Sequence, residues 1–392
     1  MRVLLLGGDG YLGWPQTLHL SSQGHDVRVV DNLARRRFDL EHGMDSLVPI
    51  AALRRRVERW RELTGRRIAF DVIDLRDHAA LARVFADFQP DAIVHYAEQR
   101  SAPYSMIDRE HAVFTQVNNI VGTLNVLYCI AEHAPDAHLV KLGTMGEYGT
   151  PNIDIEEGFL EVTHKGRRDV LPFPKQPGSF YHLSKVHDSH NIMFCCRTWG
   201  IRATDLNQGV VWGAVTEQTV LDPDLSTRYD YDHVYGTALN RFCVQAVLGH
   251  PITVYGRGGQ TRGYIDVKDT MRCIELAMLN PPERGEYRVF NQLTEQFALT
   301  DLACRVAETA RTLGYECRIE HIANPRVEAE RHYYRPVHTG LEQLGLRPHL
   351  LDQPSLGTLL GLAARHADRV DRTLLDPRID WRRLRNRLRE DR

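Results

Sequence analysis

Short apolar runs alternate with helix-length segments along the first half of the chain. The first run, Arg2–Leu6, is followed by glycine and predicts a buried parallel strand. Similar runs predict strands at 26–31, 68–74, 91–95, 138–142, 202–206 and 252–255, and helices are expected at 13–24, 78–88, 111–134 and 181–199. This alternation predicts an α/β fold, with a doubly wound parallel sheet and right-handed crossovers.

The alternation weakens after about residue 206, where Gly, Pro, Asn and Arg residues cluster repeatedly. We therefore expect a first domain over 1–206 and a smaller C-terminal α/β lobe for substrate binding over 207–392. A strand or helix near 240–275 is expected to return to the first domain, so that the second lobe is discontinuous.

Three segments depart from the pattern. Residues 33–67 are too long for an ordinary connection, and the densely charged helix expected from residue 53 is interpreted as a solvated face. Residues 150–179 contain proline and glycine and are expected to form a loop over a site. Residues 381–389 are expected to form a basic surface helix without a functional role.

Composition and charge exclude several classes of protein. The chain has 49 basic and 51 acidic residues, so no nucleic-acid partner is expected. Its seven cysteines lack a paired C-x-x-C spacing, which argues against a zinc ribbon, another metal site or a disulfide scaffold. No apolar run reaches the roughly 18 residues needed for a transmembrane segment. The first strand starts within three residues, which predicts a cytoplasmic protein without a leader.

A glycine set directly follows the first strand. Gly7, Gly10 and Gly13 give the spacing G-x-x-G-x-x-G, which allows a tight turn and brings backbone N–H groups and a helix N-terminus close to a pyrophosphate. Asp31 ends the next strand, where a carboxylate can bind the adenosine ribose hydroxyls. That carboxylate favours NAD, although Arg35–Arg37 leave NADP open. A glycine-rich turn without a ligand is the simpler alternative.

Tyr181 and Lys185 are four residues apart on an expected helix and therefore share one face. A nearby ammonium stabilises a phenolate, which can take the proton of a carbinol during hydride transfer. Thr144, at the end of the preceding strand, offers a hydroxyl to the same carbinol. Taken alone, the pair could also be an exposed i,i+4 contact.

Together these motifs resemble the extended short-chain dehydrogenase/reductases that act on nucleotide sugars. The resemblance extends through 95–98, 119–123, Asn207 and 260–269. It implies a Rossmann sheet and a tightly held NAD that is reduced and reoxidised in each cycle. Besides the glycines, Asp31, Tyr181 and Lys185, the residues expected to contact NAD are Tyr11, Leu12, Asn32, Arg35, Asp74, Leu75 and Asn119.

Longer strings resemble one branch of this family, at 98–108, 141–158, 180–191, 204–211 and 324–330. The resemblance implies UDP-glucose and sulfite as substrates: oxidation at C4, loss of water across C5–C6, addition of sulfite at C6, and reduction at C4. The expected substrate ligands are Gln99, Arg100, Thr144, Asn207, Gln260, Arg262, Arg326 and Glu328. Glu330 is an alternative to Glu328 for the ribose.

Arg100 is the expected anion ligand for sulfite, because a guanidinium offers paired N–H donors. A salt bridge to the 33–67 insertion is the alternative. Related 4,6-dehydratases carry an Asp-Glu pair after the threonine, where this chain has Met145-Gly146. Glu147 is therefore the predicted acid/base for the C5–C6 step, with His182 as a helper; both residues could instead be structural.

Two other functions remain open. One is a UDP-glucose 4-epimerase or 4,6-dehydratase, which would share the cofactor and the first oxidation. The other is a nucleotide-sensing scaffold that has lost its chemistry. The resemblance also implies a homodimer formed through the helices near 111–134 and 181–199, and a protein that donates sulfite is a further expected partner.

Overall fold

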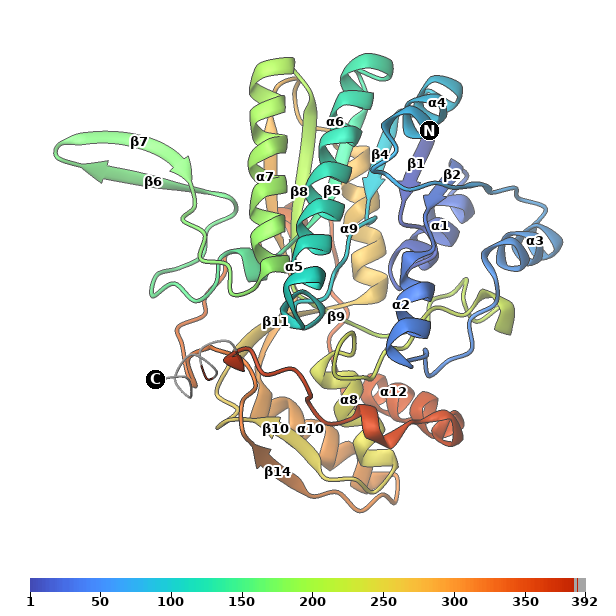
Figure 1. The fold of residues 1–392 in the computed structure, drawn as a ribbon, viewed down its shortest axis with the longest axis vertical. Helices are drawn as coiled ribbons and strands as arrows, with labels where there is room; N and C mark the ends of the chain where they lie inside the picture. The colour runs from blue at the N-terminus through green and yellow to red at the C-terminus, as the bar shows by residue number, and fades with distance from the viewer. Residues whose placement is uncertain (384–385, 387–392) are drawn as a thin grey trace.

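The computed structural model describes residues 1–383 and 386. Its centre is a parallel seven-stranded sheet of order β12-β8-β5-β4-β1-β2-β3 (Figure 1). The strands are β1 (Arg2–Leu6), β2 (Asp26–Asp31), β3 (Ala69–Val72), β4 (Ala92–His95), β5 (His138–Thr144), β8 (Arg202–Gln208) and β12 (Tyr287–Gln292). The predicted α/β class and parallel sheet are confirmed.

Helices cover both faces of this sheet because β1 is apolar on both sides. Val3 and Leu5 pack with α1 (Gly13–Ser22) and α9 (Val267–Leu279). Leu4 and Leu6 pack on the other face with α4 (His78–Phe88), α6 (Gly122–His133) and α7 (Phe180–Trp199). Fully buried strands of this kind read as continuous apolar runs, which is why β1 is recognisable in the sequence.

The second lobe lies below the sheet in Figure 1 and has its own apolar core. It contains β10 (Ile252–Tyr255) paired in parallel with β14 (Ile319–Ile322), together with α8 (Ala238–Val247), α10 (Leu299–Thr312) and α12 (Gln353–Arg365). A three-stranded sheet of β9 (Val210–Trp212), β11 (Thr261–Asp266) and β13 (Glu295–Ala298) contributes side chains to both cores. The short helix α11 (Gly340–Gln343) packs against β12 of the large sheet.

The return to the first domain differs in part from the expectation. α9 packs against the large sheet, but β10 stays in the second lobe. The strand that joins the large sheet is β12, beyond the expected range, and it pairs with β8 from Tyr287↔Ala203 to Gln292↔Gln208. The sheet therefore gains its last strand from a segment far along the chain.

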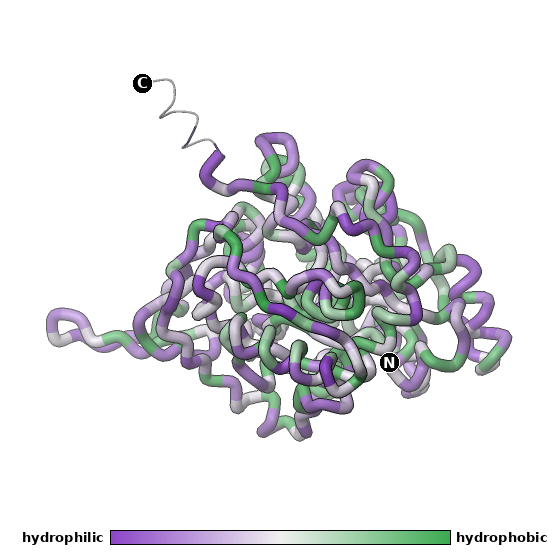
Figure 2. The backbone as a smooth tube through the Cα atoms, turned by 90° about the horizontal axis from the view of Figure 1, so that it is seen from below, coloured by the Kyte–Doolittle hydropathy of each residue, from purple (hydrophilic) through white to green (hydrophobic). Residues whose placement is uncertain are grey.

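The expected loop at 150–179 contains a hairpin instead. β6 (Phe159–His164) and β7 (Arg167–Pro172) pair antiparallel and project from the body of the protein as an arm (Figures 1 and 2). Lys165 and Gly166 join the strands, and both have positive φ, at 50° and 77°. Two such residues twist the chain in the sense that a two-residue hairpin requires. The two strands are mostly exposed, Val170 and Leu171 included, so no buried face marks them in the sequence.

The insertion after β2 is less solvated than its charge suggested. It forms α2 (Ala34–His42) and α3 (Leu53–Thr64), and Leu53, Val57 and Trp60 are buried. Arg56 is fully buried as well and donates to Asp9 Oδ1 at 3.0 Å. The interpretation of α3 as solvated was wrong for the helix face that carries these buried residues. Through Arg56, this face supports Asp9 of the glycine turn.

One long helix runs from Arg109 to His133 as α5 (Arg109–Gln116), one π-helical turn (Val117–Val121) and α6. Among the described residues it is the one helix with the length and apolar composition of a membrane span, and 44% of its most apolar window is buried. That is weak support for a span, because core helices of folded proteins meet the same two criteria. Here the helix contacts α4 and α7.

Candidate active site

Two cavities meet at the C-terminal edge of the large sheet. One, of about 160 Å³, lies over the turn after β1, and the other, of about 290 Å³, extends toward the second lobe. Residues that line both are Tyr11, Leu12, Arg100, Gly143, Tyr181, Gln208 and Tyr235. In open α/β sheets, ligands bind at this edge of the strands. Tyr181 thus stands on the wall between two adjoining binding spaces.

The glycine turn forms the floor of the smaller cavity. A Cβ on Gly13 would lie 1.9 Å from Gly7 O, and one on Gly7 (φ +88°) would lie 2.7 Å from Ala97 N. A Cβ on Gly10 would meet only Gly7 O, at 3.5 Å. The absence of a side chain at Gly7 and at Gly13 permits close packing, whereas at Gly10 it leaves open space above the turn. No side chain caps α1 at Leu12. Because Trp14 N donates to Gly10 O at 3.2 Å and residue 15 is a proline, the N–H groups of Leu12 and Gly13 are the ones that remain for an anion such as a pyrophosphate.

The residues expected near the adenosine mostly line this cavity, namely Tyr11, Leu12, Asp31, Asn32, Arg35 and Leu75. Asp31 accepts hydrogen bonds from Asp9 N at 2.8 Å and Leu33 N at 2.7 Å. Burial and the nearby Asp9 raise the pKa of Asp31 to about 6. These contacts hold its carboxylate at the end of β2, within the cavity.

The three arginines that left NADP open are engaged elsewhere. Arg35 pairs with Asp39 and with Asp230, the latter at 3.1 Å. Arg36 pairs with Asp9 at 2.5 Å, and Arg37 donates to Asn32 O at 3.3 Å. Because these cations are held by protein oxygens, they favour no 2′-phosphate, which agrees with the carboxylate of Asp31.

Three expected ligands do not reach the spaces predicted for them. Asp74 is turned to Arg76 at 2.8 Å and to Asn32 at 3.0 Å, outside the cavity lining. Asn119 is buried and donates to Gln99 O at 3.0 Å and to Ser184 Oγ at 2.9 Å, so it ties the end of β4 to α7. Gln99 lines the smaller cavity and not the larger one, and its amide is bound by Ser101 and Thr115.

Tyr181 and Lys185 lie on the buried face of α7, in agreement with the predicted spacing. Lys185 Nζ is 6.0 Å from the Tyr181 ring centre and donates to Leu142 O at 2.5 Å. It also lies 2.5 Å from Glu98 Oε2, which the sequence analysis missed. Burial raises the pKa of Tyr181, and the opposing effect of Lys185 does not overcome it. The ammonium therefore acts on this pKa in the expected direction, but burial is the larger effect.

Thr144 and His182 line the larger cavity beside Tyr181. A Cβ on Gly146 would lie only 2.3 Å from the His182 ring, so the histidine fills the space that a side chain at 146 would occupy. Its Nδ1 lies 3.0 Å from Ser179 Oγ. Burial, with Arg326 and Arg262 adding to it, lowers the pKa of His182 to about 3, so the ring is neutral near pH 7.

Glu147 does not occupy the position predicted for an acid/base. It is fully buried, outside the lining of both cavities, and pairs with Lys175 and, at 3.7 Å, with Lys141. Burial alone would raise the pKa of Glu147, but Lys141 and Lys175 outweigh it and lower the pKa to about 2. The geometry contradicts the prediction: Glu147 is a structural anion beneath the site.

The larger cavity is lined by several cations and few carboxylates. Arg262 and Arg326 lie there as predicted, with Glu328 paired to Arg262. Glu330 instead accepts from Arg257 N at 2.7 Å, outside the lining, which leaves Glu328 as the acid in the cavity. The sequence analysis missed Arg241 of α8 and Arg378 and Trp381 of the C-terminal segment, all of which line the cavity.

Two expected substrate ligands lie beneath the surface of this cavity. Asn207 is fully buried and donates to Tyr148 Oη at 2.7 Å. Gln260 is fully buried and donates to Tyr255 O at 3.5 Å. Neither lines the cavity, so both predictions are corrected. Residues 381–389 were expected to form a surface helix without a functional role, but the first of them, Trp381, lines the larger cavity. Residues 384–385 and 387–389 lie outside the described part.

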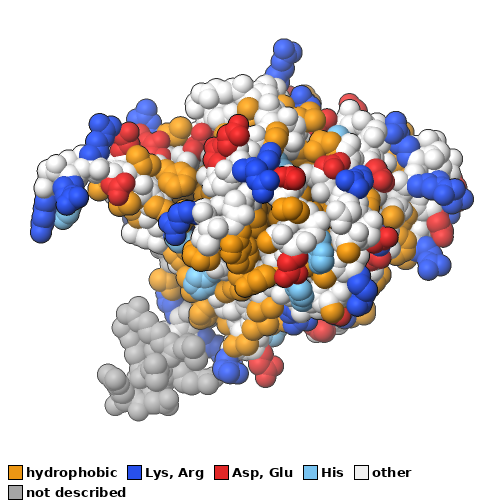
Figure 3. Space-filling view, turned by 90° about the horizontal axis from the view of Figure 1, so that it is seen from above, with side chains coloured by type: hydrophobic (Ala, Val, Ile, Leu, Met, Phe, Trp, Pro, Cys, Tyr) orange, Lys and Arg blue, Asp and Glu red, His pale blue; other side chains and the backbone are white. Residues whose placement is uncertain are grey.

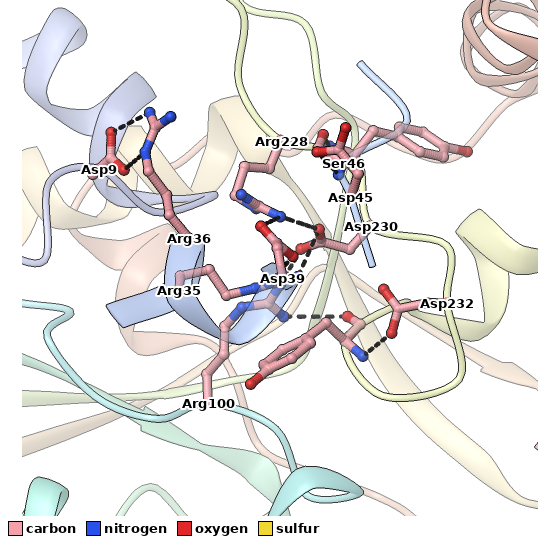
Figure 4. A network of polar contacts seen from close by, with 12 residues as sticks. Asp9, Arg35, Arg36, Asp39, Asp45, Ser46, Arg100, Arg228, Asp230 and Asp232 are labelled. Carbon is pink, nitrogen blue, oxygen red and sulfur yellow. Dashed lines mark hydrogen bonds and ion pairs between the residues drawn. The ribbon is translucent and has the colours of Figure 1, made fainter. Parts of the chain in front are cut away.

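Arg100 lines both cavities, but one side of its guanidinium is paired. It donates to Asp230 Oδ2 at 2.5 Å and to Tyr235 O at 3.4 Å (Figure 4). Asp230 also binds Arg35 and Arg228. Burial alone would raise the pKa of Asp230, but these three arginines lower it. Arg100 therefore does form a salt bridge, as the alternative interpretation expected. Its partner, Asp230, lies in the loop before α8 and not in the 33–67 insertion.

Comparison with known proteins agrees with this geometry. Residues 3–291 match the model of the NAD dependent epimerase/dehydratase family. A structural relative is the UDP-glucose 4-epimerase of Thermus thermophilus in complex with NAD, which is 25% identical, has a TM-score of 0.64, and covers 95% of this chain and 100% of its own. The chain belongs to the NAD dependent epimerase/dehydratase family, and its cofactor is NAD.

Two curated relatives narrow this class. The chloroplastic UDP-sulfoquinovose synthase of Spinacia oleracea is 58% identical over 98% of this chain and 80% of that protein. The UDP-sulfoquinovose synthase of Sulfolobus acidocaldarius is 46% identical over 89% of this chain and 88% of that protein. Within the larger family, the chain falls among the UDP-sulfoquinovose synthases.

Proposed function

We propose that this enzyme makes UDP-sulfoquinovose, a precursor of sulfolipid headgroups, from UDP-glucose and sulfite. The observation that carries the proposal is that Tyr181, Thr144 and His182 line the same cavity as three arginines, Arg241, Arg262 and Arg326. The arginines suit a diphosphate, and the other three side chains suit a sugar ring that must lose and regain protons.

The cofactor site fits NAD, which when bound accepts a hydride from C4 of the hexose and later returns it. Gly10 leaves space above the turn, and the uncapped start of α1 would hold the pyrophosphate. Asp31 and Asn32 would hold the adenosine ribose. Lys185 would orient the second ribose while remaining close to Tyr181.

Tyr181 removes the proton of the C4 hydroxyl, and Thr144 donates a hydrogen bond to the same oxygen. The C4 ketone that results makes the hydrogen on C5 acidic. Loss of that proton and of the C6 hydroxyl gives water and a C5–C6 double bond conjugated with the ketone. The sulfur lone pair of sulfite then forms a bond to C6, C5 regains a proton, and C4 is reduced with the proton returned through Tyr181.

His182 is the best-placed base for the proton on C5. Its ring fills the space beside Gly146, at the position where related dehydratases carry the second acid of their pair. It is neutral in the free protein and can accept a proton. A diphosphate bound by Arg262 and Arg326 would offset the two charges that lower its pKa and so make it a stronger base.

Sulfite is proposed to approach from the Arg100 side. This guanidinium faces both cavities, and its remaining N–H groups can hold an anion while Asp230 fixes its position. Sulfite is a good nucleophile and needs no activating base, only charge and position. A protein that delivers sulfite remains a proposal without a surface assigned to it.

We also propose a homodimer formed through α5, α6 and α7. These helices expose a set of large apolar side chains: Val113, Val117, Val121, Tyr128, Phe180, Phe194 and Trp199. Orange side chains gather on the edge of Figure 3 that corresponds to the front of Figure 1, where these helices lie. Exposed patches of this kind mark association surfaces. Val117→Arg should shift the sedimenting species from dimer to monomer, and a wild-type monomer at micromolar concentration would contradict the proposal.

We propose that the enzyme acts in the cytoplasm, a reducing compartment. All seven cysteines are described and all are free thiols. Within residues 1–383 and 386, no group of three His, Cys, Asp or Glu side chains is placed to hold a metal. The free thiols support a compartment in which disulfides do not form.

The function is tested by incubating the NAD-loaded enzyme with UDP-glucose, with and without sulfite, and measuring the mass of the sugar nucleotide. Synthase activity increases the mass by that of one SO2 and requires sulfite. A product of unchanged mass that is UDP-galactose would indicate an epimerase. A product that has lost water would indicate a 4,6-dehydratase.

A further inference from the structure

The C-terminal segment crosses the mouth of the larger cavity. In Figure 1 it runs in red from the second lobe toward β11. Pro377, Arg378, Ile379 and Trp381 line the cavity together with residues from both lobes. We call residues 377–381 the C-terminal strap.

The strap is anchored at both ends. Before it, Leu374 and Leu375 are buried in the core of the second lobe, and His233 N donates to Leu374 O at 3.0 Å. At its other end, Trp381 N donates to Pro325 O at 3.1 Å, and Arg382 Nη1 donates to Asn324 O at 3.0 Å. The segment between these anchors therefore has a defined path across the cavity.

The second anchor brings an aromatic ring to a cavity arginine. The Arg326 guanidinium carbon lies 5.4 Å from the centre of the Trp381 ring. Within the described residues, the structure gives the Arg326 guanidinium no hydrogen bond or ion pair. Burial lowers the pKa of Arg326, partly offset by Glu328, which marks a cation that has lost water without gaining a full counter-charge. Such a group is prepared to bind an anion.

We propose that the C-terminal strap closes the UDP-sugar cavity and that Trp381 is a positioning residue, whose ring holds the Arg326 guanidinium toward the diphosphate. The inference rests on the proposed function only in taking a uridine diphosphate as the ligand. Cation–π contact with a tryptophan face fixes a guanidinium while leaving its N–H edge free. Trp381 thus contributes to binding and not to the chemistry at C4–C6.

The first test measures binding of UDP alone to the NAD-loaded enzyme by calorimetry. Trp381→Leu, which keeps an apolar side chain but removes the aromatic face, should weaken UDP binding about 5- to 30-fold. Trp381→Phe should restore most of the affinity. In turnover with UDP-glucose and sulfite, the leucine variant should raise KM with little change in kcat. Wild-type UDP affinity in a folded Trp381→Leu protein would overturn the proposal.

Tryptophan fluorescence gives a readout that is independent of activity. UDP should change the emission of the wild type, and Trp381→Phe should lose most of that change. Trp199→Phe, on the outer end of α7, is the matched control and should keep it. An unchanged response in Trp381→Phe would contradict the placement of this ring at the ligand.

A third measurement needs no variant and so does not depend on folding of a mutant. Trypsin should cleave after Arg378, and saturating UDP should slow this cleavage, whereas cleavage at the exposed Arg168 of the hairpin should continue at its own rate. Equal cleavage at Arg378 with and without UDP would overturn the closure of the strap. UDP-dependent protection without any sulfonated product would instead refute the proposed function and leave the strap in place.

Discussion

The two cavities that meet at Tyr181 are built in different ways. The cofactor cavity rests on backbone: one turn of seven residues after β1, in which a side chain at Gly7, Gly8 or Gly13 would collide with its neighbours. The substrate cavity is built from long side chains that come from α7, α8, β11, the 324–328 segment and the C-terminal strap. One site is therefore local in sequence, and the other depends on the assembled second lobe.

Because of this difference, NAD binding and UDP binding should be impaired by different substitutions. The backbone turn tolerates almost no added atom at Gly7 or Gly13, because close packing fixes its shape there. A site made of arginines tolerates changes of shape but depends on charge and on the partners that hold each guanidinium. The two halves should therefore respond to different substitutions, and each of the following experiments tests that separation.

The largest effect is expected at the wall shared by the cavities. Tyr181→Phe removes the group that takes the C4 proton and should lower kcat/KM by about 10²- to 10⁴-fold, the usual contribution of general acid–base catalysis. UDP binding should remain within a factor of about two, because the ring itself is kept. Calorimetry and steady-state kinetics measure both quantities. A comparable loss of UDP affinity would assign Tyr181 to substrate binding.

Beneath both cavities, Glu147 should carry a large share of stability. Glu147→Gln removes the carboxylate that pairs with Lys175 and one of the two that pair with Lys141, the other being Asp205. The loss of this buried anion should lower the free energy of unfolding by about 3–5 kcal/mol. Glu161→Gln, in an exposed hairpin ion pair, is the matched control and should change it by less than about 0.5 kcal/mol. Urea unfolding measures both.

The pKa of Glu147 also predicts how the free energy of unfolding changes at acid pH. Its pKa is about 2 in the folded protein, below the roughly 4.3 of an unfolded glutamate, so its contribution is complete above pH ~4.3 and is lost as the pH falls toward 2. Wild type should therefore lose stability over this range more steeply than Glu147→Gln. Parallel acid limbs for the two proteins would contradict the account of this buried pair.

Within the substrate cavity, Arg241→Gln should weaken UDP binding by about 10- to 150-fold, the usual loss for a hydrogen bond to a charged group. NAD content should stay unchanged, because Arg241 lines the larger cavity and not the cofactor cavity. Its Nε is buried and has no hydrogen-bond partner among the described residues, so it can bind the diphosphate. Arg284→Gln, a surface ion-pair residue, is the control. Loss of bound NAD together with UDP would show that the two sites are not separable.

The smallest of these effects is expected from Gly10→Ala. The new methyl would point into the cofactor cavity without a backbone collision, so the protein should fold and lose only about tenfold in NAD affinity. UDP affinity should be unchanged. The same change at Gly13 would overlap Gly7 O and should prevent normal folding of the turn. Equal behaviour of the two variants would refute the assignment of their different roles.

The comparison also explains what could be predicted from the sequence. The parallel sheet, the glycine turn, Asp31 and the Tyr181–Lys185 face follow from local spacing, because each depends on residues within one strand, turn or helix. Arg241, Glu98 and Trp381 carry no local signature. They become site residues only when distant segments pack together, as when Trp381 reaches Pro325.

Errors in the prediction have a similar cause. Glu147, Asn119, Asn207 and Gln260 lie close in sequence to cavity residues, but neighbouring positions on a strand, turn or helix point in different directions. Their side chains therefore face the core and support the cavity wall. Arg56 shows the reverse case, since a charged helix face was expected to be solvated but binds Asp9 below the glycine turn.

The most direct test of the central claim follows the hydrogen atoms of the sugar. UDP-glucose carrying deuterium at C4 is converted with sulfite in ordinary water, and the product is examined by NMR. The account predicts a sulfonated sugar that keeps deuterium at C4; in a second reaction, with unlabelled UDP-glucose in heavy water, it gains one deuterium at C5. Loss of the C4 label to solvent, or a sulfonated product without solvent hydrogen at C5, would contradict it.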